Sequence, residues 1–202
     1  MSQVTILDNL DASYVDAIVE VHKNALKGFF LTNLGDGFLK TYYRAMLKNK
    51  EALAVCIVDE NNTVAGFGVG TMQSKGFHKR LILQNWFSFG LVFVKILFKS
   101  PSSIIRLAKN LEKKDPTKDH GNYPEFLLAG VSDKFQGQGM GKKLYLAYEE
   151  RAKARGAQAL TLTSDKEDND VALNHFKKLG YSVLYEYIAY PNRPMYKFIK
   201  EL

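Results

Sequence analysis

The sequence has little of what a secreted or membrane-spanning protein needs. Its single cysteine, Cys56, excludes an intramolecular disulfide, and its place in the apolar run 53–58 predicts a packed thiol in a reducing compartment. Residues 1–11 carry acidic side chains where a signal peptide needs basic and apolar ones. The longest uncharged stretch, 81–94, includes polar residues and is shorter than the roughly 20 residues that span a bilayer. These absences predict a cytoplasmic protein.

Length and charge set further bounds. The 202 residues, 46% hydrophobic and 24% charged, suffice for one globular domain with an embellishment, so 1–202 is expected to be a single domain. The net charge of +7 comes entirely from residues 71–120, which hold ten basic and three acidic residues. These basic residues follow no groove-reading pattern, so a nucleic-acid partner is not expected.

Hydrophobic periodicity predicts a mixed α/β chain. The expected strands are 4–7, 53–58, 64–71, 126–131, 159–163, 181–190 and 195–199, and the expected helices are 12–26, 36–49, 140–155 and 170–179. A short polar turn joins the second and third strands, which predicts an antiparallel hairpin. The strand, helix and strand of 126–163 predict a βαβ unit.

The most informative stretch is a glycine-rich turn before the helix 140–155, which reads Gln136-Gly137-Gln138-Gly139-Met140-Gly141-Lys142. Free N–H groups and the positive dipole at a helix start can hold a diphosphate where glycines allow close approach. A dinucleotide fingerprint would need glycine at 142, and a P-loop would need glycine at 136, so neither fits. A plain tight turn is the structural alternative, but three glycines at alternate positions exceed what one turn requires.

This spacing resembles the pyrophosphate loop Q/R-x-x-G-x-G/A of the GNAT superfamily of acyl-CoA N-acyltransferases, and the order of elements is similar over nearly the whole chain. Residues 169–181, N-D-V-A-L-N-H-F-K-K-L-G-Y, resemble the family segment N-x-x-A-x-x-x-Y-x-x-x-G-F. The resemblance implies a GNAT-like α/β fold and an N-acetyltransferase that uses acetyl-CoA and no metal.

The resemblance also implies where acetyl-CoA binds. The loop residues Gln136, Gly137, Gln138, Gly139, Met140, Gly141 and Lys142 would hold the pyrophosphate. The pantetheine arm would lie along Ala129, Gly130 and Val131 as an added strand. Asn169 would meet the far end of that arm, with Phe176 beside it.

The general acid is unassigned by the sequence. Phe176 stands where the family often has a tyrosine that protonates the departing thiolate, and a phenyl ring has no proton to give. His175 is adjacent, but its helical spacing to Ala172 and Leu179 predicts a packed side chain; Tyr181 is a weaker candidate. A thiol with a pKa near 8.5 can leave with hydrogen-bond help alone.

Glu125 is the candidate general base. An alkylammonium with a pKa of about 10.4 is only ~0.1% neutral at pH 7, so an amine acceptor needs a base. Glu125 precedes Val131 by six residues, a position at which branches of the family carry a base glutamate. The alternative is a solvent-exposed glutamate at a strand edge. Even strand parity predicts that Glu125 and Val131 share one face of the sheet under either interpretation.

Residues 72–122 stand where GNAT proteins usually have a short turn, which predicts a helical insertion between the third and fourth strands. On a helical wheel, one polar stripe contains Arg80, Gln84, Ser88, Lys95 and Lys99. The helix that carries it is expected to end at Pro101. A second, shorter helix is expected to follow, with Ile104, Ala108 and Leu111 on its apolar side. Three roles are open. The insertion packs on the domain or in a homodimer, covers an anionic acceptor as a lid, or places 80–99 on an anionic bilayer as a peripheral membrane contact.

The sequence therefore predicts transfer of an acetyl group to the primary amine of a small, anionic acceptor molecule. A protein lysine or N-terminal acetyltransferase is one alternative. A non-catalytic acyl-CoA-binding module is another, because Phe176 leaves the acid missing.

Overall fold

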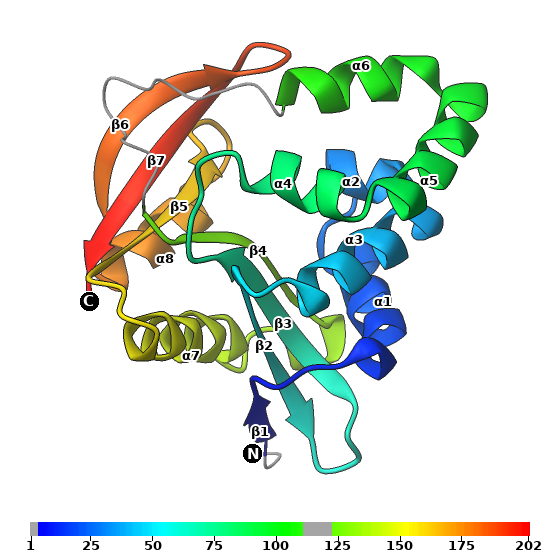
Figure 1. Cartoon of the computed structure of the whole chain (residues 1–202). Helices are drawn as coiled ribbons and strands as arrows, with labels where there is room; N and C mark the ends of the chain where they lie inside the picture. Colours follow the sequence, from blue (N-terminus) through cyan, green and yellow to red (C-terminus); the bar gives the residue numbers. More distant parts are fainter. Residues whose placement is uncertain (1–3, 111–122) are drawn as a thin grey trace.

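The computed structural model describes residues 4–110 and 123–202 and shows a mixed seven-stranded sheet covered by helices on both faces (Figure 1). The strands are β1 (Val4–Leu7), β2 (Ala52–Asp59), β3 (Val64–Thr71), β4 (Glu125–Val131), β5 (Ala159–Asp165), β6 (Ser182–Ala189) and β7 (Arg193–Glu201). The helices are α1 (Val15–Ala25), α2 (Phe30–Asn33), α3 (Asp36–Lys48), α4 (Phe77–Gln84), α5 (Trp86–Lys99), α6 (Pro101–Asn110), α7 (Met140–Ala154) and α8 (Asp170–Lys178). The α/β class predicted from the sequence is confirmed.

The sheet has the strand order β1-β2-β3-β4-β5-β7-β6. All neighbouring pairs are antiparallel except β4 and β5, which are parallel and joined by α7 in the expected βαβ unit. One core lies under α1, α3 and α5, and the other lies under α7 and α8 (Figure 1). The helices therefore divide into two layers with the sheet between them.

The connection from β3 to β4 contains three helices within the described residues, not the two predicted. α4 and α5 meet at Asn85 with a bend of 98°, and the Asn85 side-chain amide donates to the carbonyl of Leu81 at 2.9 Å. The single polar stripe expected over 80–99 is therefore wrong. Leu81 of α4 and Phe89 of α5 are both buried in the same core, on either side of the bend. Leu111 and the rest of 111–122 lie outside the described residues.

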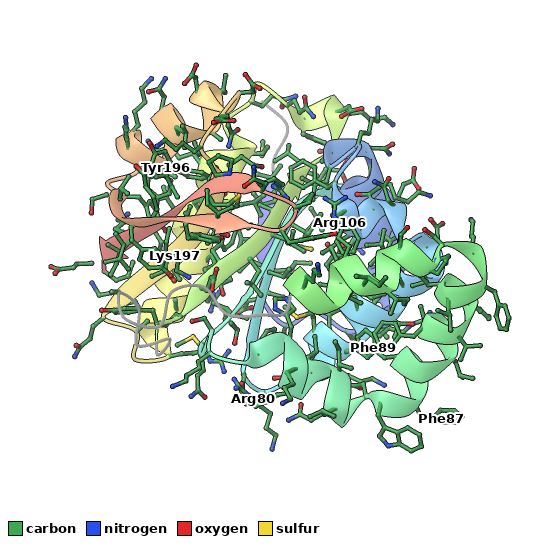
Figure 2. The ribbon with its side chains drawn as sticks, turned by 90° about the horizontal axis from the view of Figure 1, so that it is seen from above. Arg80, Phe87, Phe89, Arg106, Tyr196 and Lys197 are labelled. Atoms are coloured by element: carbon green, nitrogen blue, oxygen red, sulfur yellow. The ribbon has the colours of Figure 1, made fainter. Side chains whose placement is uncertain are left out.

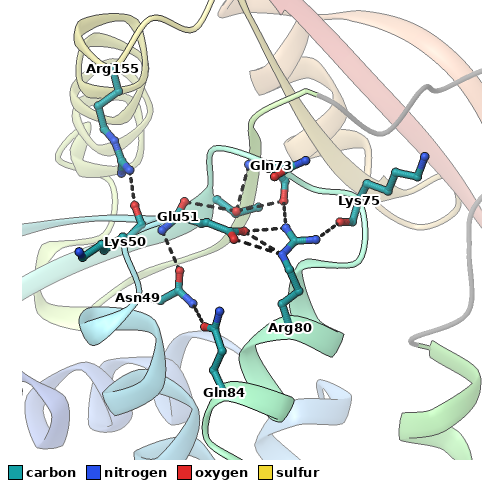
Figure 3. Close-up of polar contacts among 9 residues, drawn as sticks. Asn49, Lys50, Glu51, Gln73, Lys75, Arg80, Gln84 and Arg155 are labelled. Atoms are coloured by element: carbon teal, nitrogen blue, oxygen red, sulfur yellow. Dashed lines mark hydrogen bonds and ion pairs between the residues drawn. The ribbon is translucent and has the colours of Figure 1, made fainter.

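A bidentate ion pair fixes α4 against the sheet (Figure 3). The Arg80 guanidinium contacts Glu51 with an Nη2–Oε2 distance of 2.6 Å and also donates to the carbonyl of Gln73. Asn49 donates to the Gln84 side chain at 2.8 Å and ties the end of α3 to the end of α4. Arg80, one of the basic residues of the expected stripe, therefore serves the fold.

β4 turns away from β5 after two residue pairs, Glu125 with Thr161 and Phe126 with Leu162. At the same point, Leu127 is an extra residue in β4, because Gly70 and Val69 of β3 pair with Phe126 and Leu128. Such a bulge bends its strand and re-aims the side chains that follow. A gap between the parallel strands therefore opens beyond Phe126.

His22 is a buried polar residue of the α1–α3 core. The Thr32 hydroxyl donates to the carbonyl of Leu26 at 2.7 Å, so it accepts from Nε2–H of His22 at 3.1 Å. Nδ1 of His22 then accepts from the Tyr43 hydroxyl at 2.6 Å. Burial lowers the pKa of His22 from 6.5 to about 4. This imidazole is therefore neutral in the folded protein at neutral pH.

We expect stability to fall as the pH drops from 6.5 towards 4, because the unfolded chain then binds a proton on His22 that the folded protein does not. The loss attributable to this group is on the order of 3 kcal/mol. His22→Gln should flatten this part of the pH dependence when the free energy of unfolding is measured by urea denaturation. An unchanged slope in a folded variant would contradict the assignment.

Candidate active site

The glycine loop leaves β4 through a short 3₁₀ turn (Asp133–Phe135) and leads into α7. Gly137 and Gly139 have φ values of +72° and +75°, the left-handed region that glycine adopts at least cost. A Cβ atom on Gly137, Gly139 or Gly141 would meet no atom within 4 Å. The loop therefore presents bare backbone to open space, as a phosphate cradle requires.

Backbone N–H groups at the start of α7 supply the donors of this cradle. The N–H of Lys143 donates to the carbonyl of Gly139 at 3.1 Å, so the N–H groups of Met140, Gly141 and Lys142 precede the first helical hydrogen bond. The Met140 side chain is buried in the core beneath, which leaves its backbone for a ligand. Positive helix-dipole potential at this end favours an anion.

Two glutamines shape the loop from within. The Gln136 side chain donates to the Asp133 carboxylate at 2.9 Å and to the carbonyl of Val131 at 3.4 Å. The Gln138 side chain donates to the carbonyl of Lys134 at 3.0 Å. In this structure both predicted phosphate-binding side chains therefore hold the loop together.

The edge of β4 that faces the gap matches the predicted path of pantetheine. Ala129, Gly130 and Val131 pair with β3 on one side. On the other side, β5 pairs with β4 only at Glu125 and Phe126 within the described chain. An extended ligand could therefore add to this edge as a strand does. Its use by pantetheine stays a prediction.

A cavity of about 650 Å³ lies between α7 and α8, and Asn169, Phe176 and Tyr145 are among the residues that line it. The Asn169 side-chain amide donates to the Ser164 hydroxyl at 2.6 Å and so links the start of α8 to the end of β5. The rings of Phe176 and Tyr145 are 5.5 Å apart. The structure thus gathers both predicted residues of this end of the site around one cavity.

Tyr145 is a candidate that the sequence interpretation missed. It is half-buried, its ring lies 4.5 Å from that of Phe126, and burial raises the pKa of its phenol. His175 lines the same cavity, so it is only partly packed. Burial, with Lys142 and Lys178 nearby, lowers the pKa of His175. The sequence contained a signal for Tyr145, because it follows Gly141 of the glycine loop by four residues and therefore lies on the same face of the helix.

Glu125 lies at the closed end of the gap in a buried ion pair. Its carboxylate Oε2 is 2.9 Å from Nζ of Lys197 on β7, and the two residues are 4% and 1% exposed. Figure 2 labels Lys197 on β7. The alternative that Glu125 points into solvent is therefore wrong, whereas its role as a base stays a prediction.

The expected shared face of Glu125 and Val131 is also wrong, because the bulge changes the strand parity. Phe126 and Val131 pack towards α7, whereas Leu127 and Leu128 both pack towards α1 and α3. Two consecutive residues on one side reverse the alternation for the rest of the strand. Glu125 therefore faces the α1–α3 side, and the glycine loop continues from the α7 side.

Helix α6 extends over the α1–α3 side of the sheet and carries two basic residues. The Arg106 guanidinium carbon lies 4.7 Å from the ring centre of Phe30 in α2, and Nζ of Lys109 lies 4.6 Å from that of Tyr190 beside β6. Nε of Arg106 is buried without a hydrogen-bond partner in the described parts of the chain. This helix therefore contacts Phe30 of α2 at one point and Tyr190, which follows β6, at another.

Residues 104–181 match the model of the acetyltransferase (GNAT) family. Among curated proteins, none matches the sequence.

Solved structures resemble the whole fold. The ribosomal-protein-S18-alanine N-acetyltransferase from Escherichia coli aligns with a TM-score of 0.61 at 12% identity and covers 98% of this chain and 94% of that one. Arylalkylamine N-acetyltransferase 2 from Aedes aegypti aligns with a TM-score of 0.63 at 17% identity, over 98% and 99%.

A third structure, PaiA N-acetyltransferase from Thermoplasma acidophilum in complex with coenzyme A, aligns with a TM-score of 0.56 at 13% identity, over 99% of both chains. At these identities the likeness concerns the fold alone. The GNAT resemblance predicted from the sequence is therefore confirmed, by the family model over 104–181 and by the fold of the described chain.

Proposed function

We propose that this protein is an acetyl-CoA-dependent N-acetyltransferase that acts on the primary amine of a small anionic acceptor. The observation that carries the proposal is the gap between β4 and β5. The anion cradle lies at its open end on the α7 side, and the Glu125–Lys197 pair lies at its closed end on the α1–α3 side. A thioester and an amine that enter from opposite faces would meet there.

The cradle supports the use of a diphosphate-bearing acyl donor. Three consecutive N–H groups, two left-handed glycines and an open approach suit a pyrophosphate. Coenzyme A carries a pyrophosphate and, as its acyl thioester, supplies an activated carbonyl. The similar PaiA structure in complex with coenzyme A supports the same choice.

Glu125 is proposed to receive the proton that the amine loses on attack, directly or through a water molecule. The ammonium of Lys197 at 2.9 Å holds the carboxylate in place. Lys197 is a positioning residue in this scheme. The amine nitrogen forms the new amide bond, the carbon–sulfur bond breaks, and the sulfur leaves with its electron pair.

Tyr145 is proposed to stabilise the departing sulfur with a hydrogen bond. Its raised pKa keeps the phenol protonated at neutral pH, so it acts as a donor and need not transfer its proton fully. His175 lines the same cavity and is the second candidate donor.

The α6 cations support an anionic acceptor. Arg106 keeps a buried Nε without a partner in the described chain, on a helix whose Leu107 packs in the α1–α3 core. A carboxylate or phosphate on the acceptor would supply the missing hydrogen-bond acceptor and a compensating charge. An acceptor lysine or peptide N-terminus lacks such a group unless acidic residues flank it.

Gly141→Val tests the cradle. The φ of Gly141 is not in the left-handed region, and a Cβ atom at this position would meet no protein atom within 4 Å, so the variant should fold. The side chain would occupy the space of the phosphate and weaken acetyl-CoA binding about tenfold or more, since hydrogen bonds to charged groups are lost. The measurement is the Kd, with the ligand-induced rise in Tm as a second readout.

Gly37→Val is the matched control. Gly37 is also the second residue of a helix, has open space around its Cβ position and lacks a left-handed φ. The Gly37→Val variant should change the Tm by about as much as Gly141→Val does, and it should leave the Kd for acetyl-CoA unchanged. Equal affinity in both variants would refute the cradle.

Glu125→Gln tests the base. A panel of neutral, anionic and peptide amines is first assayed with the wild-type protein, and the best acceptor is then used for the variant. The kcat should fall about 100-fold or more, and the Kd for acetyl-CoA should stay unchanged. The single variant leaves the Lys197 ammonium buried without this carboxylate, at a cost of about 3–5 kcal/mol in stability.

The double variant Glu125→Gln with Lys197→Met removes both charges and separates the two roles. It should recover most of the lost stability and keep the low kcat. A double variant with wild-type kcat would assign the pair to the fold alone. Acetyl-CoA binding by the wild-type protein without turnover of any amine would instead identify a non-catalytic module.

Tyr145→Phe tests the hydrogen bond to sulfur. The kcat should fall at least tenfold, since a lost hydrogen bond to a charged group is worth about 1.5–3 kcal/mol. Phe176→Tyr in the same chain places a phenol on the neighbouring ring, 5.5 Å away, and should restore part of the rate. A wild-type kcat for Tyr145→Phe would exclude the assignment.

A further inference from the structure

The helices between β3 and β4 carry an unusual amount of exposed apolar surface. Eight of the fifteen large hydrophobic side chains that are exposed in the described chain lie within residues 77–110. We call them the apolar face: Leu83, Trp86, Phe87, Leu91, Val94, Leu97, Phe98 and Ile105. Six of the eight lie on the single helix α5, and soluble monomers seldom expose large apolar patches without a binding function.

Helix α5 is apolar on both of its sides. Phe89 and Phe93 point inward, with ring centres 6.1 and 6.4 Å from that of Phe38. Phe87, Leu91, Val94 and Phe98 follow at spacings of four, three and four residues and form an outward stripe. Figure 2 shows Phe89 turned into the body and Phe87 turned away from it. A helix packed on one side only would carry polar residues on the other.

The charge of this segment is of one sign. From residue 61 to residue 111 the sequence has no Asp or Glu and seven basic residues, Lys75, Lys79, Arg80, Lys95, Lys99, Arg106 and Lys109. Lys95 and Lys99 are exposed on α5 itself, and Lys79 and Lys109 are exposed on the flanking helices. Arg80 is already paired with Glu51, so the exposed lysines are the charges that an occupant of the apolar face would meet, and an occupant that is both apolar and anionic would match them.

We propose that the apolar face docks the protein on the surface of an anionic lipid bilayer. The aromatic and aliphatic side chains would enter the boundary between headgroups and acyl chains, and the lysines would contact lipid phosphates. α5 has 14 residues and is therefore about 21 Å long, a length that suits a helix lying in the plane of the interface.

Two other arrangements fit the observations less well. A twofold contact through this face would bring two copies of the same basic segment together, and residues 61–111 contain no acidic residue to compensate for the charge. No single helix in the described residues is long and apolar enough to cross a membrane; α4 and α5 satisfy the length and composition only together, across a bend of 98°.

Trp86 provides a direct readout, because it is the sole tryptophan of the chain and is 69% exposed on the apolar face. The full chain should be mixed with vesicles of phosphatidylcholine alone and of phosphatidylcholine with phosphatidylglycerol. With the anionic vesicles the emission should shift to shorter wavelength, brominated lipid should quench it, and the protein should sediment with the vesicles. Absence of binding to anionic vesicles would overturn the proposal.

Two pairs of variants define the contact. Lys95→Gln with Lys99→Gln should weaken binding to anionic vesicles about 30-fold, and the exposed lysines Lys48 and Lys153, changed to Gln, should have a far smaller effect. Phe87→Ser with Phe98→Ser should abolish the quenching, and the matched change of exposed Leu146 and Val183 should not. Equal effects of test and control variants would contradict a specific face.

Sedimentation equilibrium distinguishes the other occupant. A dimer that forms without lipid, is lost in Phe87→Ser with Phe98→Ser, and shifts Trp86 emission without quenching by brominated lipid would assign the apolar face to a second copy and refute lipid docking. A monomer without lipid, together with the quenching, supports it. Neither result depends on acetyl transfer, so the proposed enzymatic function is tested separately.

Discussion

The departure of β4 from β5 is the constraint on which the site depends. Parallel strands normally remain paired along their length, but here pairing stops at Phe126, where Leu127 adds a residue to β4. The bulge bends the strand and reverses its parity. As a result, Val131 next to the glycine loop lies on the α7 side of the sheet, whereas the carboxylate of Glu125 lies on the α1–α3 side. A continuous sheet would separate these two faces completely.

The Glu125–Lys197 pair has an energetic oddity that favours a functional role. Burial of two charges costs several kcal/mol per ion, and apolar residues of similar volume often give equal or greater stability. Here both members are almost fully buried at the point where the strands separate. A carboxylate fixed beside a gap is placed to take part in a proton transfer, whereas elsewhere in the core the same pair would only cost desolvation energy.

The parts that could be predicted were local in the chain. The glycine spacing at 137, 139 and 141 specifies a loop conformation within a few residues, and strand and helix periods need only short windows. The bulge at Leu127 could not be predicted, because strict alternation fits the sequence of β4 equally well. Lys197 was missed because it lies 72 residues from Glu125, and only the sheet order brings the two together. The prediction of one polar stripe over 80–99 was wrong because it assumed a single straight helix through Asn85, where the chain bends.

The segment between β3 and β4 unites the two proposals through one electrostatic property. Its α6 lies beside the face from which an amine would reach Glu125, and its α5 carries the apolar face. The stretch from 61 to 111 has basic but no acidic residues, so the same charge would favour both the proposed anionic acceptor and the proposed anionic bilayer. Acidic residues on α5 would weaken both proposed attractions. Either proposed role therefore accounts for the lack of acidic residues in this segment, and the two roles together favour it more strongly.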